Sequence, residues 1–128
     1  MQRTDIKIRS SEGGEFDCNL VTPDATGKVP AVVLASAVHG VDQDVRAIAD
    51  EFAAAGYIAA APSVQEAYRG VPSRMRNVEV HIFPGVLHGY MMPGNAKAFD
   101  RKTRDFSMTR ALAILDALRE DTRVALQR

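Results

Sequence analysis

His88 is the residue of this chain whose position in the sequence best suits a general base. It follows an alternating apolar run, Val78–Phe83, and a Pro84-Gly85 turn, so we expect it on a loop just beyond the end of a strand. Imidazole titrates near neutral pH and is the side chain most often used as a general base. Such a base acts on a nucleophile within hydrogen-bond reach, so the chemistry of His88 depends on a serine, cysteine or similar group beside it.

The sequence offers no nucleophile in the setting that usually activates one. A hydrolase nucleophile commonly stands on a strained strand-to-helix turn, Gly-x-Ser-x-Gly, and neither this pattern nor its cysteine counterpart occurs in the chain. Cys18, the single cysteine, lies in an alternating segment and is interpreted as a packed apolar side chain. Ser36 has two interpretations: a nucleophile in a Ser36–His88 dyad oriented by Asp42 or Asp44, or a serine that caps a turn.

The histidines also have interpretations without catalysis. His88 can be a loop residue bonded to backbone or water. His39, His88 and Asp42 are residue types that bind zinc, but no close-spaced ligand pair is present, so neither a metal nor another cofactor is expected. His81 falls within an alternating run and is interpreted as a surface or interface residue.

Two alternating segments near the N-terminus predict an antiparallel hairpin at a sheet edge. Thr4–Arg9 and Glu15–Val21 each alternate between apolar and polar residues, and Ser11–Gly14 forms the turn between them.

The composition excludes several classes of protein. The 16 basic and 16 acidic residues give a net charge of zero, so the chain has no positive electrostatic field to attract nucleic acid. No apolar stretch approaches the ~18 residues of a membrane span, and one cysteine forms no disulfide within the chain. A cytoplasmic protein is therefore expected.

The middle of the chain predicts a strand, a helix and a strand. Ala31–Ala35 and Tyr57–Ala61 are short, continuous apolar runs that suit buried strands. Between them, Asp42 or Asp44 can cap a helix that Gly56 closes. The helix carries one apolar stripe, made of Val45, Ile48, Ala49, Phe52 and Ala53. This order predicts a right-handed βαβ unit with parallel strands.

The C-terminal half predicts less regular structure before a final helix. Val64–Met75 has helical spacing but is interrupted by Gly and Pro, and Val78–Phe83 reads as a strand. The loop Gly85–Ala98 contains Met91 and Met92, which either line an apolar pocket or partner surface or pack the loop onto the helices. A helix is expected from about Lys102 to Arg119, with an inward apolar set of Met108, Ala111, Leu112, Leu115 and Leu118.

The chain resembles the dienelactone hydrolase family of α/β hydrolases in two pieces. Val32–Asp42 and Ile48–Pro62 are similar to the family's third strand, oxyanion loop, first helix and fourth strand. Pro84–Tyr90 and Thr109–Leu118 are similar to its catalytic-histidine segment and closing helix. The family's nucleophile elbow and the strand that ends in its triad aspartate have no counterpart between the two pieces. We interpret residues 1–128 as one internally truncated domain, with portions 1–63 and 64–128 joined near residues 63/64.

The resemblance implies roles for several residues. His88 corresponds to the family's base, and backbone N–H groups near Val38, in the loop that contains His39, would face a developing oxyanion. Tyr90 and Met91, just after His88, are candidate binding residues. The family's substrate-positioning glutamate corresponds to Ala37, and its substrate-binding arginine falls near Met92. These two departures argue against a diene-lactone substrate.

The expected fold is a small three-layer α/β sandwich, a truncated α/β hydrolase with a mostly parallel sheet and an N-terminal antiparallel hairpin. The Val78–Phe83 strand would lie beside Ala31–Ala35, or a second copy would cover the open edge in a strand-edge or swapped homodimer. The expected function is that of a dienelactone-hydrolase-like protein acting on a small ester or lactone, with activity weak or lost because the nucleophile is absent. The alternative is a non-catalytic scaffold that dimerises or binds a small apolar ligand.

Overall fold

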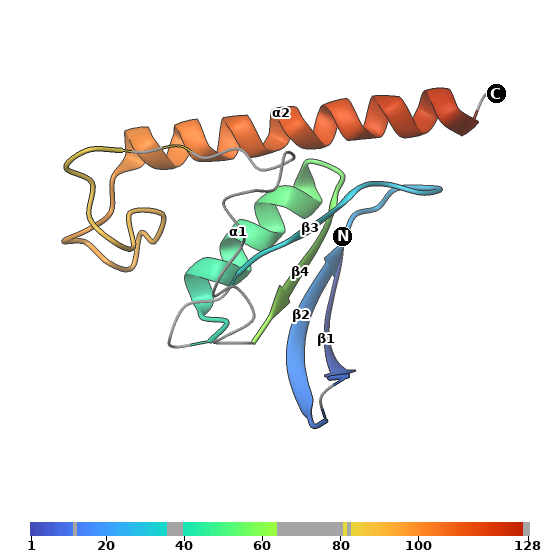
Figure 1. The fold of residues 1–128 in the computed structure, drawn as a ribbon, viewed down its shortest axis with the longest axis horizontal. Helices are drawn as coiled ribbons and strands as arrows, with labels where there is room; N and C mark the ends of the chain where they lie inside the picture. The colour runs from blue at the N-terminus through green and yellow to red at the C-terminus, as the bar shows by residue number, and fades with distance from the viewer. Residues whose placement is uncertain (12, 36–39, 64–80, 82, 127–128) are drawn as a thin grey trace.

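Four strands and two helices make up the described part of the chain (Figure 1). The structure, a computed structural model, describes residues 1–11, 13–35, 40–63, 81 and 83–126. The elements, in chain order, are β1 (Gln2–Arg9), β2 (Glu15–Thr22), β3 (Ala31–Val33), α1 (Gln43–Ala54), β4 (Ile58–Pro62) and α2 (Arg101–Leu126). The predicted hairpin, βαβ order and closing helix are confirmed.

The strands form one mixed sheet in the order β1-β2-β4-β3. β3 and β4 are parallel, as predicted, but β1 pairs antiparallel with β2, and β2 pairs antiparallel with β4. The prediction of a mostly parallel sheet was therefore wrong. The reason is that the hairpin belongs to the same sheet as the parallel strands. Its second strand, β2, pairs antiparallel with β4 from Cys18↔Pro62 to Val21↔Ala59. The hairpin thereby supplies two of the four strands.

The helix α1 begins and ends where the sequence predicts. Asp42 is the N-cap, and its Oδ1 accepts a hydrogen bond from the Val45 backbone N–H at 2.9 Å. After the helix, the Gly56 N–H donates to the Ala53 carbonyl at 3.0 Å, and Gly56 has φ of +91°, a left-handed conformation that glycine adopts without strain. This turn leads directly into β4.

Both helices pack on the same face of the sheet. Val21 of β2 is paired with Ala59 of β4, and Ala59 is also paired with Val32 of β3, so these three side chains share one face. The buried cluster on this face joins both helices to the sheet and contains Val21, Ile48, Ala49, Phe52, Ala53, Tyr57, Ala59, Met108 and Leu115. The described elements thus form two layers. The helix expected over residues 64–75 falls outside the described residues.

Among the described strands, β3 is the edge strand on one side of the sheet. Val33 is paired with Ala60 and points to the face opposite the helices, where it is 61% exposed. The predicted Val78–Phe83 strand falls largely on residues that the structure does not describe. Of that segment, His81 and Phe83 are described and belong to no strand. Its expected pairing with Ala31–Ala35 therefore stays a prediction.

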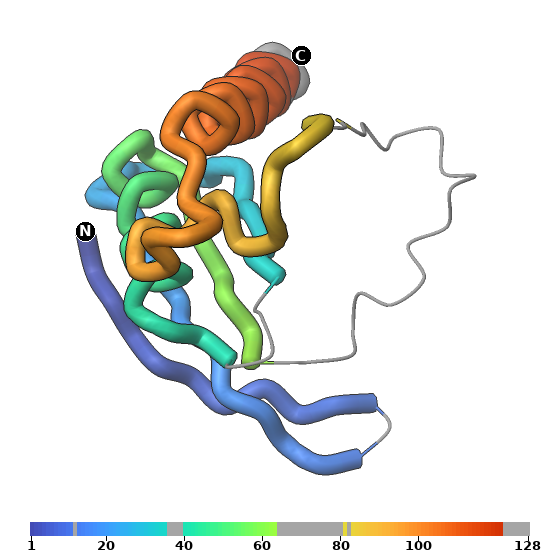
Figure 2. The backbone as a smooth tube through the Cα atoms, turned by 90° about the vertical axis from the view of Figure 1, so that its left-hand side faces the viewer, coloured from blue at the N-terminus to red at the C-terminus, as the bar shows by residue number. Residues whose placement is uncertain are grey.

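The helix α2 is longer than its apolar pattern predicts, since it continues to Leu126. Asp100 caps its start, with Oδ1 accepting the Thr103 backbone N–H at 2.8 Å. Met108 and Leu115 are buried as expected, but Leu118 is 48% exposed, so its predicted inward position was wrong. Figure 2 looks nearly along α2 and shows the loop of residues 83–100 running between its first turn and the region of α1. The last turns of α2 extend past the sheet (Figure 1).

Candidate functional site

His88 lies on an exposed turn that follows Pro84 and Gly85. The turn places the imidazole in solvent, and no hydrogen bond joins it to another residue of the described ranges. Gly89, next to it, has φ of +89°, and a Cβ added there would lie 3.0 Å from Asn95 Nδ2. The backbone beside His88 is therefore tightly packed although the imidazole itself is exposed.

The predicted partners of His88 divide into two groups. Ser36, Val38 and His39 lie outside the described residues, so the dyad and the oxyanion site stay predictions. The two carboxylates are described, and both bind backbone N–H groups. Asp42 caps α1, and Asp44 Oδ2 accepts the Gly94 N–H at 3.0 Å. Each carboxylate thus has a structural role, and no described contact links either of them to His88.

The loop that carries His88 is a chain of hydrogen-bonded turns. The Met92 N–H donates to the Gly89 carbonyl at 3.0 Å, and the Asn95 N–H donates to the Met92 carbonyl at 2.9 Å. The Asp100 N–H returns to the Tyr90 carbonyl at 3.1 Å. Together with the Asp44 contact, these bonds fix the loop between α1 and the start of α2, although its sequence is rich in glycine.

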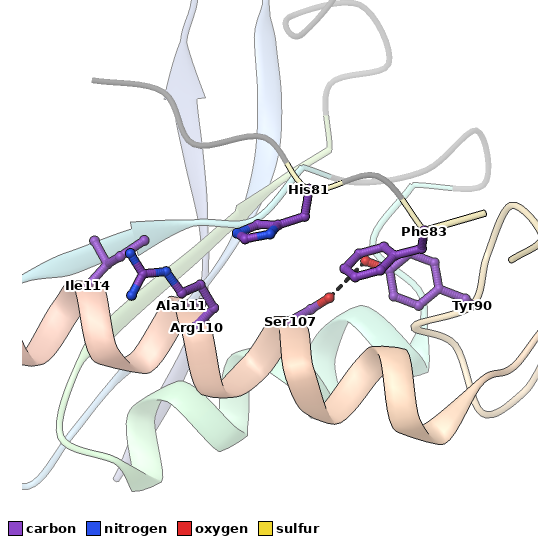
Figure 3. Close-up of a pocket in the computed structure, with 7 residues that line it drawn as sticks. All are labelled: His81, Phe83, Tyr90, Ser107, Arg110, Ala111 and Ile114. Carbon is purple, nitrogen blue, oxygen red and sulfur yellow. Dashed lines mark hydrogen bonds between the residues drawn. The ribbon is translucent and has the colours of Figure 1, made fainter. Parts of the chain in front are cut away.

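A cavity of about 290 Å³ lies between this loop and α2 (Figure 3). It is lined by His81, Phe83, Tyr90, Ser107, Arg110, Ala111 and Ile114. Phe83 and Tyr90 lie in edge-to-face contact in its wall, with ring centroids 5.8 Å apart. Phe83 also makes an edge-to-face contact with Phe106, at 5.6 Å between centroids, although Phe106 does not line the cavity. The Tyr90 hydroxyl lies 3.0 Å from Ser107 Oγ.

A second cavity, of about 320 Å³, adjoins the first and is almost wholly apolar. Its walls come from β3, α1, the loop and α2: Val32, Leu34, Ala35, Val45, Ile48, Phe52, Tyr90, Met91, Met92, Ser107, Met108 and Ala111. Tyr90 and Met91, two residues proposed from the sequence as binding residues, both line it. Ser107 and Ala111 were missed, because a small residue on a helix face gives no signal until the loop that it faces is known.

A polar pocket of about 420 Å³ lies at the N-terminal end of α1. It is lined by Asp5, Asp17, Asn19, Gly40, Val41, Arg46 and Ser63. Asn19 Nδ2 and Arg46 Nη1 both donate to Asp5 Oδ1, at 3.0 and 3.1 Å, and these two hydrogen bonds lower the pKa of Asp5. Asn19 is only 4% exposed, and its Oδ1 has no hydrogen-bond partner among the described residues. Ser63 carries the one hydroxyl among the described residues that line this pocket, and none of these residues is a histidine.

The remaining chemical candidates are inert in the described structure. Cys18 is 1% exposed, and burial is the main cause that raises the pKa of its thiol, so its interpretation as a packed residue is confirmed. Among the described residues, no three histidine, cysteine, aspartate or glutamate side chains are grouped to hold a metal ion. Neither described helix is long and apolar enough to cross a lipid bilayer.

Comparison with known proteins identifies a related family for the first part of the chain. Residues 16–73 match the model of the dienelactone hydrolase family. A curated protein of Azospirillum brasilense named "Putative carboxymethylenebutenolidase" is 34% identical over 61 residues, which cover 48% of this chain and 26% of that protein. The chain thus spans about a quarter of the length of this relative. The resemblance of the first piece to the dienelactone hydrolase family is confirmed.

The position of the family match bears on the catalytic residues. It begins in β2, includes all of α1 and β4, and continues past residues 63/64 to residue 73. His88, Tyr90 and α2 lie beyond its end. The role of His88 therefore still rests on the local motif Pro84–Tyr90.

Proposed function

We propose that this chain, whose residues 16–73 match the dienelactone hydrolase family, is a dienelactone-hydrolase-like protein with little or no hydrolytic activity of its own. Its ancestral substrate class would be small esters or lactones. The observation that carries the proposal is the combination of a hydrolase-type histidine loop with the absence, from all 128 residues, of a nucleophile elbow.

The surroundings of His88 support the loss of activity. A triad histidine is held by a carboxylate and hydrogen-bonded to the nucleophile, which fixes its tautomer and orientation. His88 is exposed, and Asp42 and Asp44 bind backbone N–H groups instead. A free imidazole in water catalyses ester hydrolysis only weakly, because nothing positions it against the carbonyl.

A covalent probe tests the proposal directly. A hydrolase serine nucleophile reacts with a fluorophosphonate, and the modified residue is identified by mass spectrometry of the intact chain and its peptides. We expect no stoichiometric labelling of the chain and no difference between it and Ser36→Ala. Full labelling at Ser36 that disappears in both Ser36→Ala and His88→Ala would overturn the proposal and establish the dyad.

The second candidate function is a non-catalytic scaffold that forms a homodimer. Two observations favour it: β3 is an edge strand of the sheet that the structure describes, and Val33 on it is exposed. An unpaired strand edge is a template for pairing with another chain. Sedimentation velocity across a concentration series tests it. A dimer that Val33→Lys dissociates supports strand-edge pairing; a monomer at all concentrations contradicts it.

A further inference from the structure

We propose that the two adjoining cavities between the loop and α2 form one binding site for a neutral apolar alcohol or phenol. The site does not depend on His88 or on residual hydrolysis. One part of the site is the apolar cavity beside β3, and the other part is the aromatic cavity of Figure 3. Ligand sites commonly have this character, an apolar enclosure of a few hundred Å³ with few polar groups.

Three residues connect the cavities into one site. Tyr90, Ser107 and Ala111 line both of them, so the boundary between the two is made of one phenol, one hydroxyl and one methyl group. Met91, Met92 and Met108 line the apolar part, and thioether side chains adapt to ligands of different shape. The apolar body of an elongated ligand can therefore lie in the apolar cavity, with the polar group of the ligand at the Tyr90–Ser107 pair.

The hydrogen bonds at that pair determine the kind of polar group that fits. Ser107 Oγ donates to the Thr103 carbonyl at 2.9 Å, which uses its only hydrogen. The contact of 3.0 Å between the two hydroxyls must then be a donation from Tyr90 to Ser107. Both hydroxyl hydrogens are therefore engaged, and toward the cavities the two oxygens can only accept hydrogen bonds. A ligand that completes this network has to donate a hydrogen bond.

The charge of the site excludes the other common donors. Arg110 lines the same cavity, and Figure 3 shows its guanidinium at the Ile114 end, away from Tyr90. A positive charge there disfavours an ammonium group in a largely apolar space. A carboxylate has no hydrogen to donate and would meet the lone pairs of both hydroxyls. A neutral O–H donor, as in an alcohol or a phenol, satisfies both conditions.

The test compares three probes that share one apolar body. These are 4-propylphenol, 4-propylanisole and 4-propylbenzoate, which present a donor, no donor and an anion, respectively. Binding is followed by amide NMR shifts of the full chain, with dissociation constants from titration. We expect the phenol to bind about ten-fold tighter than the anisole, the benzoate to bind more weakly than the phenol, and the shifts to centre on Tyr90, Met91 and Ser107. Equal affinities for phenol and anisole, or tightest binding of the benzoate, would overturn the proposal.

Two sets of variants locate the site. Tyr90→Phe removes one of the two acceptor oxygens at the boundary and is expected to reduce the preference for phenol over anisole. Ala111→Leu fills the boundary and is expected to weaken phenol binding at least ten-fold, whereas Ala113→Leu, the same change at an exposed position of α2 outside both cavities, leaves it unchanged. Unchanged binding in Ala111→Leu would contradict the site, and this pair decides the question even if Tyr90→Phe fails to fold.

Discussion

Different kinds of contact hold the two regions of this molecule. The sheet region, β1 to β4 with α1, is joined by continuous backbone ladders and by ion pairs such as Arg3–Asp50, with Nε 2.8 Å from Oδ1. The helix region, residues 83–100 with α2, forms no ladder with the sheet. It is joined to the sheet region by part of the shared core and by a few polar contacts. The family match begins and ends outside the helix region.

The helix region makes its polar contacts with α1 and with the residues that directly follow α1. Arg104 pairs with Glu51 in the last turn of α1. Farther along α2, Asp116 accepts a hydrogen bond from the Tyr57 hydroxyl, and Arg119 lies over the Tyr57 ring, 4.1 Å from its centroid. Because backbone ladders fix only the sheet region, side chains determine where α2 lies. The proposed ligand site lies between the two regions, where side chains rather than backbone ladders hold them together.

The largest effect is expected from Phe52→Ala, because Phe52 belongs to the core that both regions share. Loss of a buried phenyl ring and the resulting cavity should lower the free energy of unfolding by about 3–5 kcal/mol. Urea denaturation measures it. The control is Phe106→Ala on α2, where the side chain is 46% exposed and the loss should be much smaller. Equal losses would mean that the two regions do not share a core.

A glycine pair tests how tightly the loop at His88 is packed. Gly89 and Gly27 have nearly the same φ, +89° and +90°, but only at Gly89 does an added Cβ meet a neighbour, Asn95 Nδ2 at 3.0 Å. Both substitutions to alanine cost left-handed strain of about 1 kcal/mol. Gly89→Ala should therefore be the more destabilising, and it should shift the amide signals of the loop. Equal destabilisation would show that the loop yields to the added methyl group.

Tyr57 is expected to make the attachment of α2 sensitive to alkaline pH. Burial, followed by its hydrogen bond to Asp116, raises the pKa of Tyr57 in the folded chain. Its neutral form is therefore favoured by folding, so its contribution is complete below the unfolded pKa of about 10 and is lost as pH rises through the folded pKa.

Tyr57→Phe removes this titration together with the hydrogen bond. It should lower the free energy of unfolding near neutral pH by about 1–2 kcal/mol and flatten the decline above pH ~10. Denaturation profiles from pH 7 to 11 measure both effects. An equally steep alkaline decline in the variant would assign it to other groups.

A smaller effect separates the two roles considered for Asp42. As the cap of α1 it is replaceable by asparagine, so Asp42→Ala should cost about 1 kcal/mol and Asp42→Asn close to nothing. As the carboxylate that orients a base, it is not replaceable by asparagine. Thermal melts and ester hydrolysis measured on the same two variants distinguish the roles. A loss of hydrolysis in Asp42→Asn with unchanged stability would favour the catalytic role.

Local patterns predicted the sheet region well. The apolar stripe of α1 and its Asp42 cap depend on residues within a few positions of one another, as do the two hairpin strands. The antiparallel pairing of β2 with β4 was not predicted, because it depends on which strands meet in space. Asn19, buried among alternating apolar residues, and the exposed Leu118 depend in the same way on contacts that no local period encodes.

The candidate site was predicted only in part for the same reason. The motif around His88 identified the loop, and Met91 was singled out as a pocket residue. Ser107 and Ala111, which join the two cavities, stand 17 and 21 positions beyond Tyr90 in the sequence. Their role follows from the crossing of α2 over the loop. A helix pattern shows which face is apolar but not which segment it meets.

The rate of ester hydrolysis is the most direct test of the central claim that His88 has no nucleophile to activate. The substrate is 4-nitrophenyl acetate at pH 7 to 8, with the unaltered chain and His88→Ala compared at equal concentration and with free imidazole as reference. We expect the rates of the unaltered chain and of His88→Ala to agree within about two-fold, with no saturation by substrate. A saturable rate that falls ten-fold or more in His88→Ala, at unchanged stability, would contradict it.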